Sequence, residues 1–519
     1  MFSDNFQTLI GIILYLVAIV IVGLWYARRG GSSPEEYFLA KRGFGPWVTA
    51  MSAGASDMSG WLLMGLPGLV FFTGLGEAFW TVLGLFIGTC VNWTVVAKRL
   101  RSYSEVAGNS ITLPEFFSKR FHDEKRILLA IAAVISLVFF SIYVGAQFIT
   151  FGRLFSYIFS IDMRYMIVLG ATIVLLYTLL GGFWAVGMTD LIQGLLMVSA
   201  LALVTLFGLV HAGGIAGVME NLQNFPRFTD FFGIATPVTE NGAQQIRNGI
   251  PVFGAGADFG LLAIISAMAW GLGYFGMPQV LLRFMAIQKV SMIRSSITIA
   301  IIWCLIAQIS AVFIGLIGRA ILPTSFYTAA SAESIFTLLS LTFFPPLFAG
   351  IVISGILAAS MSSADSYMLI VSSSLANDIY RDIFKKNASD REVMLLGRSA
   401  IALVTIFGVI VAITGNQSIF RVVSYAWAGL GASFGPLILF SLFWKRTTFH
   451  GALAGMITGG VMVVLWQNVI SRLGGVFAVY ELLPAFIISC IVIAVVSVCT
   501  KKPSEKIEKE FELAKKANF

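Results

Sequence analysis

Three acidic residues lie in stretches of sequence that are otherwise apolar, namely Asp57, Asp190 and Asp365. Asp57 stands in "MSAGASDMSGWLLMG", which also holds three serines and three glycines. A charge at the centre of a membrane helix costs roughly 2.5–3.5 kcal/mol on insertion scales, and such residues usually mark a functional site. Carboxylate, hydroxyl and carbonyl oxygens are the ligands that a hard cation such as sodium prefers. The first expectation is therefore an ion site within the apolar part of the chain.

A second stretch, "GILAASMSSADSYMLIVSSS", offers hydroxyl groups at helical spacing. Ala359, Ser362, Ser363 and Ser366 stand at positions i, i+3, i+4 and i+7, so they share one face of a helix. Serines in membrane helices also bond back to their own backbone carbonyls or hold helices together. A cluster of this size next to a buried carboxylate, however, favours a cation site.

The composition indicates a membrane protein. Of the 519 residues, 58% are hydrophobic and only 12% are charged, against about 25% charged in average soluble proteins. A helix needs about 20 apolar residues to cross a bilayer, and the first span lacks a signal-peptide cleavage site. The thirteen predicted spans are 8–27, 47–73, 76–97, 127–157, 164–181, 183–212, 259–282, 295–318, 346–376, 399–414, 418–444, 450–471 and 482–500.

The basic residues predict the orientation of these spans, because cytoplasmic loops collect lysine and arginine. They place the N-terminus outside and the C-terminus in the cytoplasm. The net charge of +8 is then a signal of topology, so the lipid bilayer is an expected partner and nucleic acid is not. The predicted cytoplasmic segments hold 27 of the 34 basic residues and are 28–45, 98–126, 283–294, 381–398, 445–446 and the tail from Lys501.

Two of the spans are interrupted by small residues. "SAGASDMSGWLLMGLPG" in the second span and "SAMAWGLGYFGMP" in the seventh are rich in glycine, which weakens a helix. Such breaks at corresponding positions predict an inverted five-plus-five transporter repeat; close packing of small residues is the alternative. The expected organisation is a first helix and cytoplasmic loop at 1–45, repeats at 46–212 and 259–445, an extracytoplasmic loop at 213–258, two additional helices at 446–500 and a cytoplasmic tail at 501–519.

Other classes of protein have less support. The four cysteines and three histidines show no metal-ligand spacing, and no nucleophile stands beside a base, so we do not expect an enzyme. A sensor built on a transporter scaffold would usually bring a cytoplasmic signalling domain. Only 20 residues follow Cys499.

Several stretches together resemble the sodium/solute symporter family, and most closely its sodium/proline symporters. They are "SAGASDMSGWLLMGLPG", "AWGLGYFGMPQVLLRFMA", "LAASMSSADS" and "VSYAWAGLGASFGPLILFSLFWKR". The resemblance extends over essentially the whole chain. It implies an all-α membrane fold with discontinuous second and seventh helices, in which one helix precedes the repeats and two follow. It also implies inward transport of a solute driven by sodium.

The resemblance further implies which residues bind sodium. The main site would use the carbonyls of Ala55, Met58 and Ala359 and the hydroxyls of Ser362 and Ser363. Asp57 would lie beside this site and couple the ion to transport, although it could instead only bond free backbone N–H groups.

A second ion site at Asp190, Asp365 and Ser366 is a further hypothesis. The two carboxylates lie roughly 10 and 16 Å from the cytoplasmic helix ends, at 1.5 Å per residue, so they could approach each other. Two bare carboxylates would repel, hence either one is protonated or a cation sits between them. The alternative is that the acids cap backbone groups or help close an inner gate.

The substrate residues are also implied by the resemblance. An ammonium and a pyrrolidine ring suit aromatic faces, and the start of a resumed half-helix suits a carboxylate, although aromatic residues in membrane helices more often only pack. Gln147 and Met277 depart from the family's pattern and bear on which solute is carried. The implied substrate residues are Ser59, Gly60, Trp61, Tyr143, Trp270, Tyr274 and Pro278.

The function expected from the sequence is sodium-coupled uptake of L-proline across a bacterial inner membrane. Another amino acid, a compatible solute or a small carboxylate is the alternative substrate.

Overall fold

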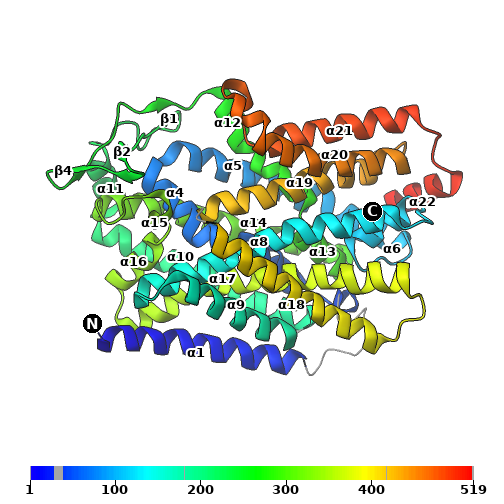
Figure 1. Ribbon diagram of the computed structural model, residues 1–519, viewed down its shortest axis with the longest axis horizontal. Coiled ribbons are helices and arrows are strands. Elements are labelled where there is room, and N and C mark those ends of the chain that lie inside the picture. The colour runs from blue at the N-terminus through cyan, green and yellow to red at the C-terminus, as the bar shows by residue number, and fades with distance from the viewer. Residues whose placement is uncertain (1, 28–38, 181, 416–417, 517–519) are drawn as a thin grey trace.

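The structure is a computed structural model that describes residues 2–27, 39–180, 182–415 and 418–516. The chain is mostly helical, and its long helices run side by side with the two termini at opposite ends (Figure 1). Most of the predicted loop 28–45 lies outside the described residues.

The first repeat follows α1 (Phe2–Ala27) and begins with a broken helix. One of its later members continues through a wider helical turn into a further helix. The short helix α7 (Leu113–Arg120) lies between two long helices of the repeat. The members of the repeat are α3 (Pro46–Gly60) with η2 (Trp61–Gly65) and α4 (Leu66–Thr73), α5 (Leu75–Val91) with η3 (Asn92–Val96) and α6 (Ala97–Val106), α8 (Ile127–Phe159), α9 (Met163–Leu180) and α10 (Phe183–His211).

The second repeat also begins with a broken helix. Two long helices and a short one come after this repeat. Its members are α12 (Leu261–Met268) with η4 (Ala269–Gly276) and α13 (Pro278–Ala286), α14 (Ile293–Ile321), α17 (Pro346–Ser373) with η6 (Ser374–Phe384), α18 (Asp390–Thr414) and α19 (Ile419–Phe443). The helices after the repeat are α20 (Phe449–Asn468), α21 (Leu482–Cys499) and α22 (Glu505–Lys516).

The predicted fold class is confirmed, and the predicted helix count is approximate. The described residues hold 11 helices that are long and apolar enough to cross a membrane, or 12 if the bent pair Leu261–Gly276 and Pro278–Ala286 is one span. The predicted total of thirteen is reached only if the shorter apolar helix Met163–Leu179 is counted as well.

One predicted boundary was wrong in a way that matters for the site. The seventh span was expected to end at 282, which put Arg283 in a cytoplasmic loop. In the structure α13 continues to Ala286, and the Arg283 side chain is fully buried. A positive charge therefore lies within the helix bundle.

The predicted loop 213–258 holds more structure than expected. It contains α11 (Gly214–Leu222) and three two-stranded ladders of two-residue strands. Two further short helices, α15 (Ala329–Ala332) and α16 (Ile335–Phe343), lie at the same end of the molecule (Figure 1). The strands are β1 (Gly233–Ile234) with β6 (Ala257–Asp258), β2 (Thr239–Glu240) with β3 (Ala243–Gln244), and β4 (Ile246–Arg247) with β5 (Ile250–Pro251).

The broken helix of the first repeat lies at the centre of the bundle. In the apolar window of Pro46–Thr73, 94% of the residues are buried, against 33% in the window of α1. Helix α3 packs against α10, α13, α14 and α17, so residues near its break face four other helices. This arrangement lets side chains from both repeats meet at one place.

Candidate ion and substrate site

The first broken helix changes direction at Ser59. Its φ of 47° and ψ of −175° interrupt the helical conformation inside α3. The Gly60 N–H donates to the side-chain oxygen of Gln147 at 3.1 Å, and the Trp61 N–H donates to the Ser59 hydroxyl at 3.2 Å. Gln147, which departs from the expected family pattern, thus satisfies a backbone group that the break frees.

Only glycine fits at position 60. A Cβ atom there would lie 2.4 Å from the Thr150 hydroxyl oxygen on α8, closer than any normal contact. The absence of a side chain therefore lets α8 approach the break and bring Gln147 to it.

The predicted main ion residues come together between α3 and α17. The Ser362 hydroxyl lies 2.8 Å from the Ala55 carbonyl oxygen and 3.1 Å from the Ala359 carbonyl oxygen. The hydroxyl of Ser363, fully buried beside it, has no hydrogen bond of normal geometry within the described chain. The Met58 carbonyl, one turn after Ala55, accepts from the Trp61 N–H. A buried group of oxygens with an unsatisfied hydroxyl fits a bound cation.

Asp57 is connected to the second broken helix. The residue is only 5% exposed, and its carboxylate accepts a hydrogen bond from the Gln279 side-chain nitrogen at 3.3 Å. Gln279 is the second residue of α13, directly after Pro278. The carboxylate therefore links the two breaks and lies two residues from Ala55 along the chain.

Side chains of neighbouring helices donate hydrogen bonds to backbone carbonyls in the second broken helix. Asn92 donates to the Tyr274 carbonyl at 3.0 Å, and the Trp427 indole donates to the Trp270 carbonyl at 2.9 Å. These two carbonyls lie in η4, whose glycines and following Pro278 disfavour a continuous α-helix. Asn92 and Trp427 were not predicted as site residues. The amide of Asn92, a polar group within an apolar span, was the available signal.

The predicted substrate residues form aromatic contacts around the breaks. The rings of Trp61 and Trp270 lie 5.5 Å apart, those of Tyr143 and Tyr367 4.5 Å apart. All four side chains are less than 10% exposed. The indole nitrogen of Trp61 is buried without a hydrogen-bond partner in the described part of the chain. Tyr367, on the serine-bearing helix α17, was missed by the sequence analysis.

The other two buried acids lie in different surroundings. The Arg283 guanidinium contacts the Asp190 carboxylate at 3.1 Å and donates to the Ser366 hydroxyl at 2.7 Å. The Ser52 hydroxyl donates to Asp190 at 2.6 Å. By contrast, neither carboxylate oxygen of Asp365 has a hydrogen-bond donor of normal geometry among the residues that the structure describes. Arg283 is thus a positive partner for Asp190 that the sequence analysis, which weighed a proton or a cation, did not consider.

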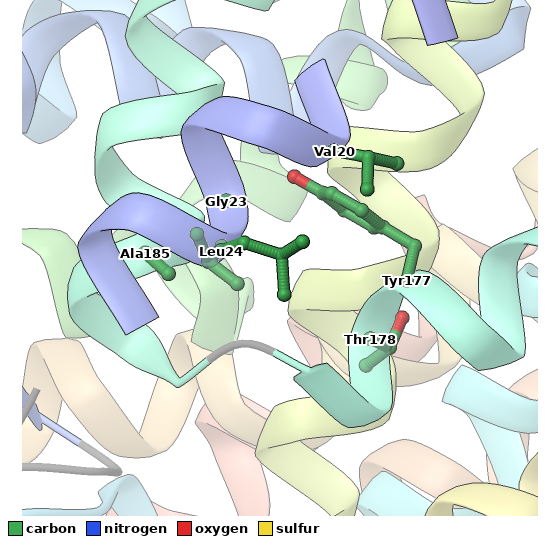
Figure 2. Close-up of a pocket in the computed structure, with 7 residues that line it drawn as sticks. Val20, Gly23, Leu24, Tyr177, Thr178 and Ala185 are labelled. Carbon is green, nitrogen blue, oxygen red and sulfur yellow. The ribbon is translucent and has the colours of Figure 1, made fainter. Parts of the chain in front are cut away.

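A small cavity elsewhere offers no binding site. It lies between α1, α9 and α10 and is lined by Val20, Gly23, Leu24, Tyr177 and Ala185, among others (Figure 2). Its volume of about 10 Å³ is at the lower limit for one water molecule, and its walls are mostly apolar. It is therefore a packing defect beside the bundle.

Comparison with known proteins defines the class. The model of the sodium:solute symporter family matches residues 37–459. The high-affinity proline transporter PutP of Bacillus subtilis (strain 168) is 42% identical over 94% of this chain and 97% of its own. The osmoregulated proline transporter OpuE of the same strain is 38% identical over 99% of each chain. A solved sodium-coupled sialic acid symporter in a substrate-bound, outward-open state shares the fold, with a TM-score of 0.75 at 19% identity over 97% of this chain and 99% of its own.

The chain therefore belongs to the sodium:solute symporter family, as its sequence motifs indicated. It is a multi-pass membrane transporter that couples solute movement to sodium, and not an enzyme.

Proposed function

We propose that this protein takes up L-proline together with sodium across a bacterial inner membrane by alternating access. Two relatives that cover nearly the whole chain are named as proline transporters. The observation that carries the proposal is the Ser362 hydroxyl, which bridges the Ala55 carbonyl at the break of α3 to the Ala359 carbonyl of α17. A cation bound there would hold the two repeats together.

Sodium is a co-transported substrate in this scheme. Its ligands would be the carbonyls of Ala55, Met58 and Ala359 and the hydroxyls of Ser362 and Ser363, which are buried in the structure. The Asp57 carboxylate would attract the ion and, through its hydrogen bond to Gln279, couple the ion's presence to the second broken helix.

Proline would bind between the two breaks. Its ring and ammonium would lie against the aromatic faces of Trp61, Trp270, Tyr143 and Tyr274, a favourable arrangement for a cation beside aromatic rings. Its carboxylate would accept from the N–H groups at Ser59 to Trp61, where the half-helix resumes. In the structure the Gln147 side-chain oxygen already accepts from the Gly60 N–H, so Gln147 would yield this donor to the substrate. Pro278 would complete the pocket at the start of α13.

The energetics suffice for uptake. One sodium ion moving down a potential of about 100 mV gains roughly 2.3 kcal/mol. A tenfold concentration gradient adds about 1.4 kcal/mol. Together these can accumulate a zwitterion several hundredfold.

We assign different roles to the other two acids. Asp190, paired with Arg283, would act in closing the cytoplasmic side, where the ion pair joins α10 to α13. Asp365 and Ser366 would form a second ion site or a way-station for the exit of the first ion. The orientation that fits this scheme has the N-terminus outside and the C-terminus in the cytoplasm.

Uptake of labelled proline into proteoliposomes tests the proposal. Uptake should appear with an inward sodium gradient and disappear when the gradient is absent. Competition by a panel of unlabelled amino acids, compatible solutes and carboxylates identifies the preferred solute, which Gln147 and Met277 leave open. Sodium-dependent uptake that proline fails to inhibit would replace proline with another solute.

A further inference from the structure

Four residues beside the C-terminal helix α22 hold buried polar atoms without hydrogen-bond partners in the described chain. They come from α6, α7 and α19, and their unpaired atoms are Arg99 Nε, the Tyr103 hydroxyl, Arg120 Nη1 and Nη2, and the Ser441 hydroxyl. Tyr103, Arg120 and Ser441 are fully buried. Buried polar groups in native proteins nearly always have a partner, so these unpaired atoms point to a ligand.

The four residues lie close to one another. The Arg120 guanidinium stands over the Tyr103 ring at 5.1 Å, and its Nε donates to the Ser441 carbonyl at 3.2 Å. The guanidiniums of Arg99 and Arg120 lie 5.1 and 5.6 Å from the centre of one ring, that of Phe511. Two positive charges and two hydroxyls from three helices therefore meet beside one aromatic side chain.

Phe511 belongs to α22, which covers this group of residues. The buried residues of α22 are Ile507, Phe511 and Ala514, which stand at i, i+4 and i+7 and so share one face of the helix. With this face α22 packs beside α6 (Figure 1). The Glu510 carboxylate adds a contact with the His122 ring nitrogen at 2.9 Å. The cover is thus a short amphipathic helix that follows the last membrane-spanning helix.

The positive charge of the group is only partly compensated. Among the residues that the structure describes, neither Arg99 nor Arg120 has a carboxylate within 4 Å, and the charges of Glu510 and Glu512 act on them from further away. The face of Phe511 attracts a guanidinium, but it supplies no acceptor oxygen for the N–H groups. A buried charge without a hydrogen-bonded counter-charge is costly. Helix α22 therefore covers the arginines without satisfying them.

The group lies at the ends of two membrane-spanning helices, where lipid headgroups are found. The spans Leu75–Val106 and Ile419–Phe443 both end here. The Arg99 guanidinium stands 5.0 Å from the Phe443 ring, which is 41% exposed and would face lipid. Basic residues just beyond a membrane helix attract anionic phospholipids. Such residues, exposed or half-buried, follow α19 and precede α22, namely Lys445, Arg446, Lys501 and Lys502.

We propose that this group is a binding site for a phosphate group, which competes with α22 for the two arginines. A phosphate offers several acceptor oxygens, and arginine pairs with it through two parallel hydrogen bonds. The guanidiniums and the two hydroxyls bind these oxygens in the place of the Phe511 ring. Departure of α22 also removes the carboxylates of Glu510 and Glu512, which leaves the site more positive. An anionic phospholipid and a free phosphate share this chemistry, and the position beside Phe443 favours the phospholipid.

Hydrogen exchange of the α22 backbone amides tests the proposal in the purified full-length protein in nanodiscs at constant ionic strength. In phosphatidylcholine alone the amides should exchange slowly, because the helix is docked. Addition of phosphatidylglycerol to the lipid should make them exchange at least about tenfold faster. A third preparation, phosphatidylcholine with inorganic phosphate in the buffer, separates the two sources. Acceleration by phosphatidylglycerol alone assigns the site to a lipid headgroup, and acceleration by inorganic phosphate assigns it to a free phosphate.

Two variants that each remove a single hydroxyl test the site itself. Neither Tyr103→Phe nor Ser441→Ala breaks a hydrogen bond of the docked state, since both hydroxyls are unpaired in the described chain. Each should raise the amount of phosphatidylglycerol or phosphate needed for half-maximal acceleration about tenfold, because one hydrogen bond to a charged ligand is lost. The control is Arg126→Gln, which removes a positive charge that pairs with Asp382 at 3.0 Å and should behave as the wild type.

Two results would overturn the site. One is wild-type exchange that is equal in all three preparations. The other is an acceleration that occurs at wild-type amounts of phosphatidylglycerol or phosphate in both Tyr103→Phe and Ser441→Ala, because the effect would then come from the general positive charge of the surface. Neither result involves proline or sodium, so the phosphate site and the proposed function fail independently.

Discussion

The two broken helices interrupt their hydrogen-bond ladders in different ways. The first turns at a single residue, Ser59, with φ of 47°. The second passes through an eight-residue stretch of tighter helix, Ala269–Gly276, and bends by 43° before α13. A break at one residue frees few backbone groups at one point. A longer stretch of 3₁₀ helix instead changes the direction of successive side chains step by step.

The partners of the freed groups differ accordingly. At the first break the partners are small or flexible polar side chains, Gln147, Ser59 and Ser362. At the second they are Asn92 and the Trp427 indole, which donate to the carbonyls of Tyr274 and Trp270. The first break thus has mainly oxygens and N–H groups as partners, and the second has an amide and an indole. In the proposed scheme the ion and the carboxylate bind at the first break, and the ring and the ammonium bind the aromatic residues around both breaks.

The buried ion pair between Arg283 of α13 and Asp190 of α10 joins the two repeats, and its removal predicts the largest effect. Arg283→Ala would leave the Asp190 carboxylate buried without its partner, which typically costs 3–5 kcal/mol. The thermal stability of the purified protein should fall sharply. The double variant Arg283→Ala/Asp190→Asn should recover most of the loss, because no charge is then left unpaired. Equal instability of the single and double variants would show that the guanidinium acts through packing alone, including its contact with the Phe183 ring at 4.8 Å.

Gly60→Ala tests whether the sharp break requires the close approach of α8. The added methyl group would lie 2.4 Å from the Thr150 hydroxyl, and overpacking of this kind typically costs 1–3 kcal/mol. Sodium-driven uptake should fall at least about tenfold. Thr150→Ala in the same chain should restore part of it. Gly260→Ala is the matched control, because nothing lies within 4 Å of its Cβ position and no positive φ strains it. Normal uptake by Gly60→Ala would mean that the break tolerates a wider spacing.

Loss of an aromatic side chain near the breaks should lower the affinity for substrate without changing the sodium dependence. Trp270→Ala, Tyr274→Ala and Tyr143→Ala should each weaken proline binding at saturating sodium, by about 1–3 kcal/mol for a lost aromatic contact. Equilibrium binding to purified protein measures the effect. Tyr165→Ala, an aromatic residue 71% exposed on α9, should leave it unchanged. If all three inner variants bind proline normally, the pocket lies elsewhere or proline is not the solute.

The fold was largely predictable because its signals are local. Long apolar runs determined the helices, and glycine clusters with Pro278 indicated both breaks. The serine stripe of α17 was predictable from helical spacing, since Ser362 and Ser363 follow Ala359 by three and four residues and need only one helix to lie beside it.

What sequence reasoning missed depends on contacts between distant segments. Arg283 lay close to a predicted helix end, and a shift of four residues in that boundary, from 282 to Ala286, moved its charge from a loop into the bundle. Its pairing with Asp190 joins residues 93 positions apart, which no local pattern reveals. Gln147 was noticed only as a departure from a motif, because its role depends on the close approach of α8 at Gly60. The partnership of Asp57 with Gln279 likewise required both breaks to be placed in space.

The smallest expected effect tests the proposed sodium ligands on α17. Ser362→Ala removes the hydroxyl that lies 2.8 Å from the Ala55 carbonyl, and Ser363→Ala removes an unsatisfied one. Loss of one oxygen ligand costs about 1–1.5 kcal/mol, so the sodium concentration for half-maximal uptake should rise about tenfold. Proline affinity at saturating sodium should barely change, because in the proposed scheme aromatic residues, and not these hydroxyls, bind the ring and the ammonium. Ser354→Ala is the control on the same helix, since among the described residues that hydroxyl bonds only the Gly350 carbonyl one turn back, at 2.8 Å. An unchanged sodium dependence in both Ser362→Ala and Ser363→Ala would remove the ion from the first break and from α17.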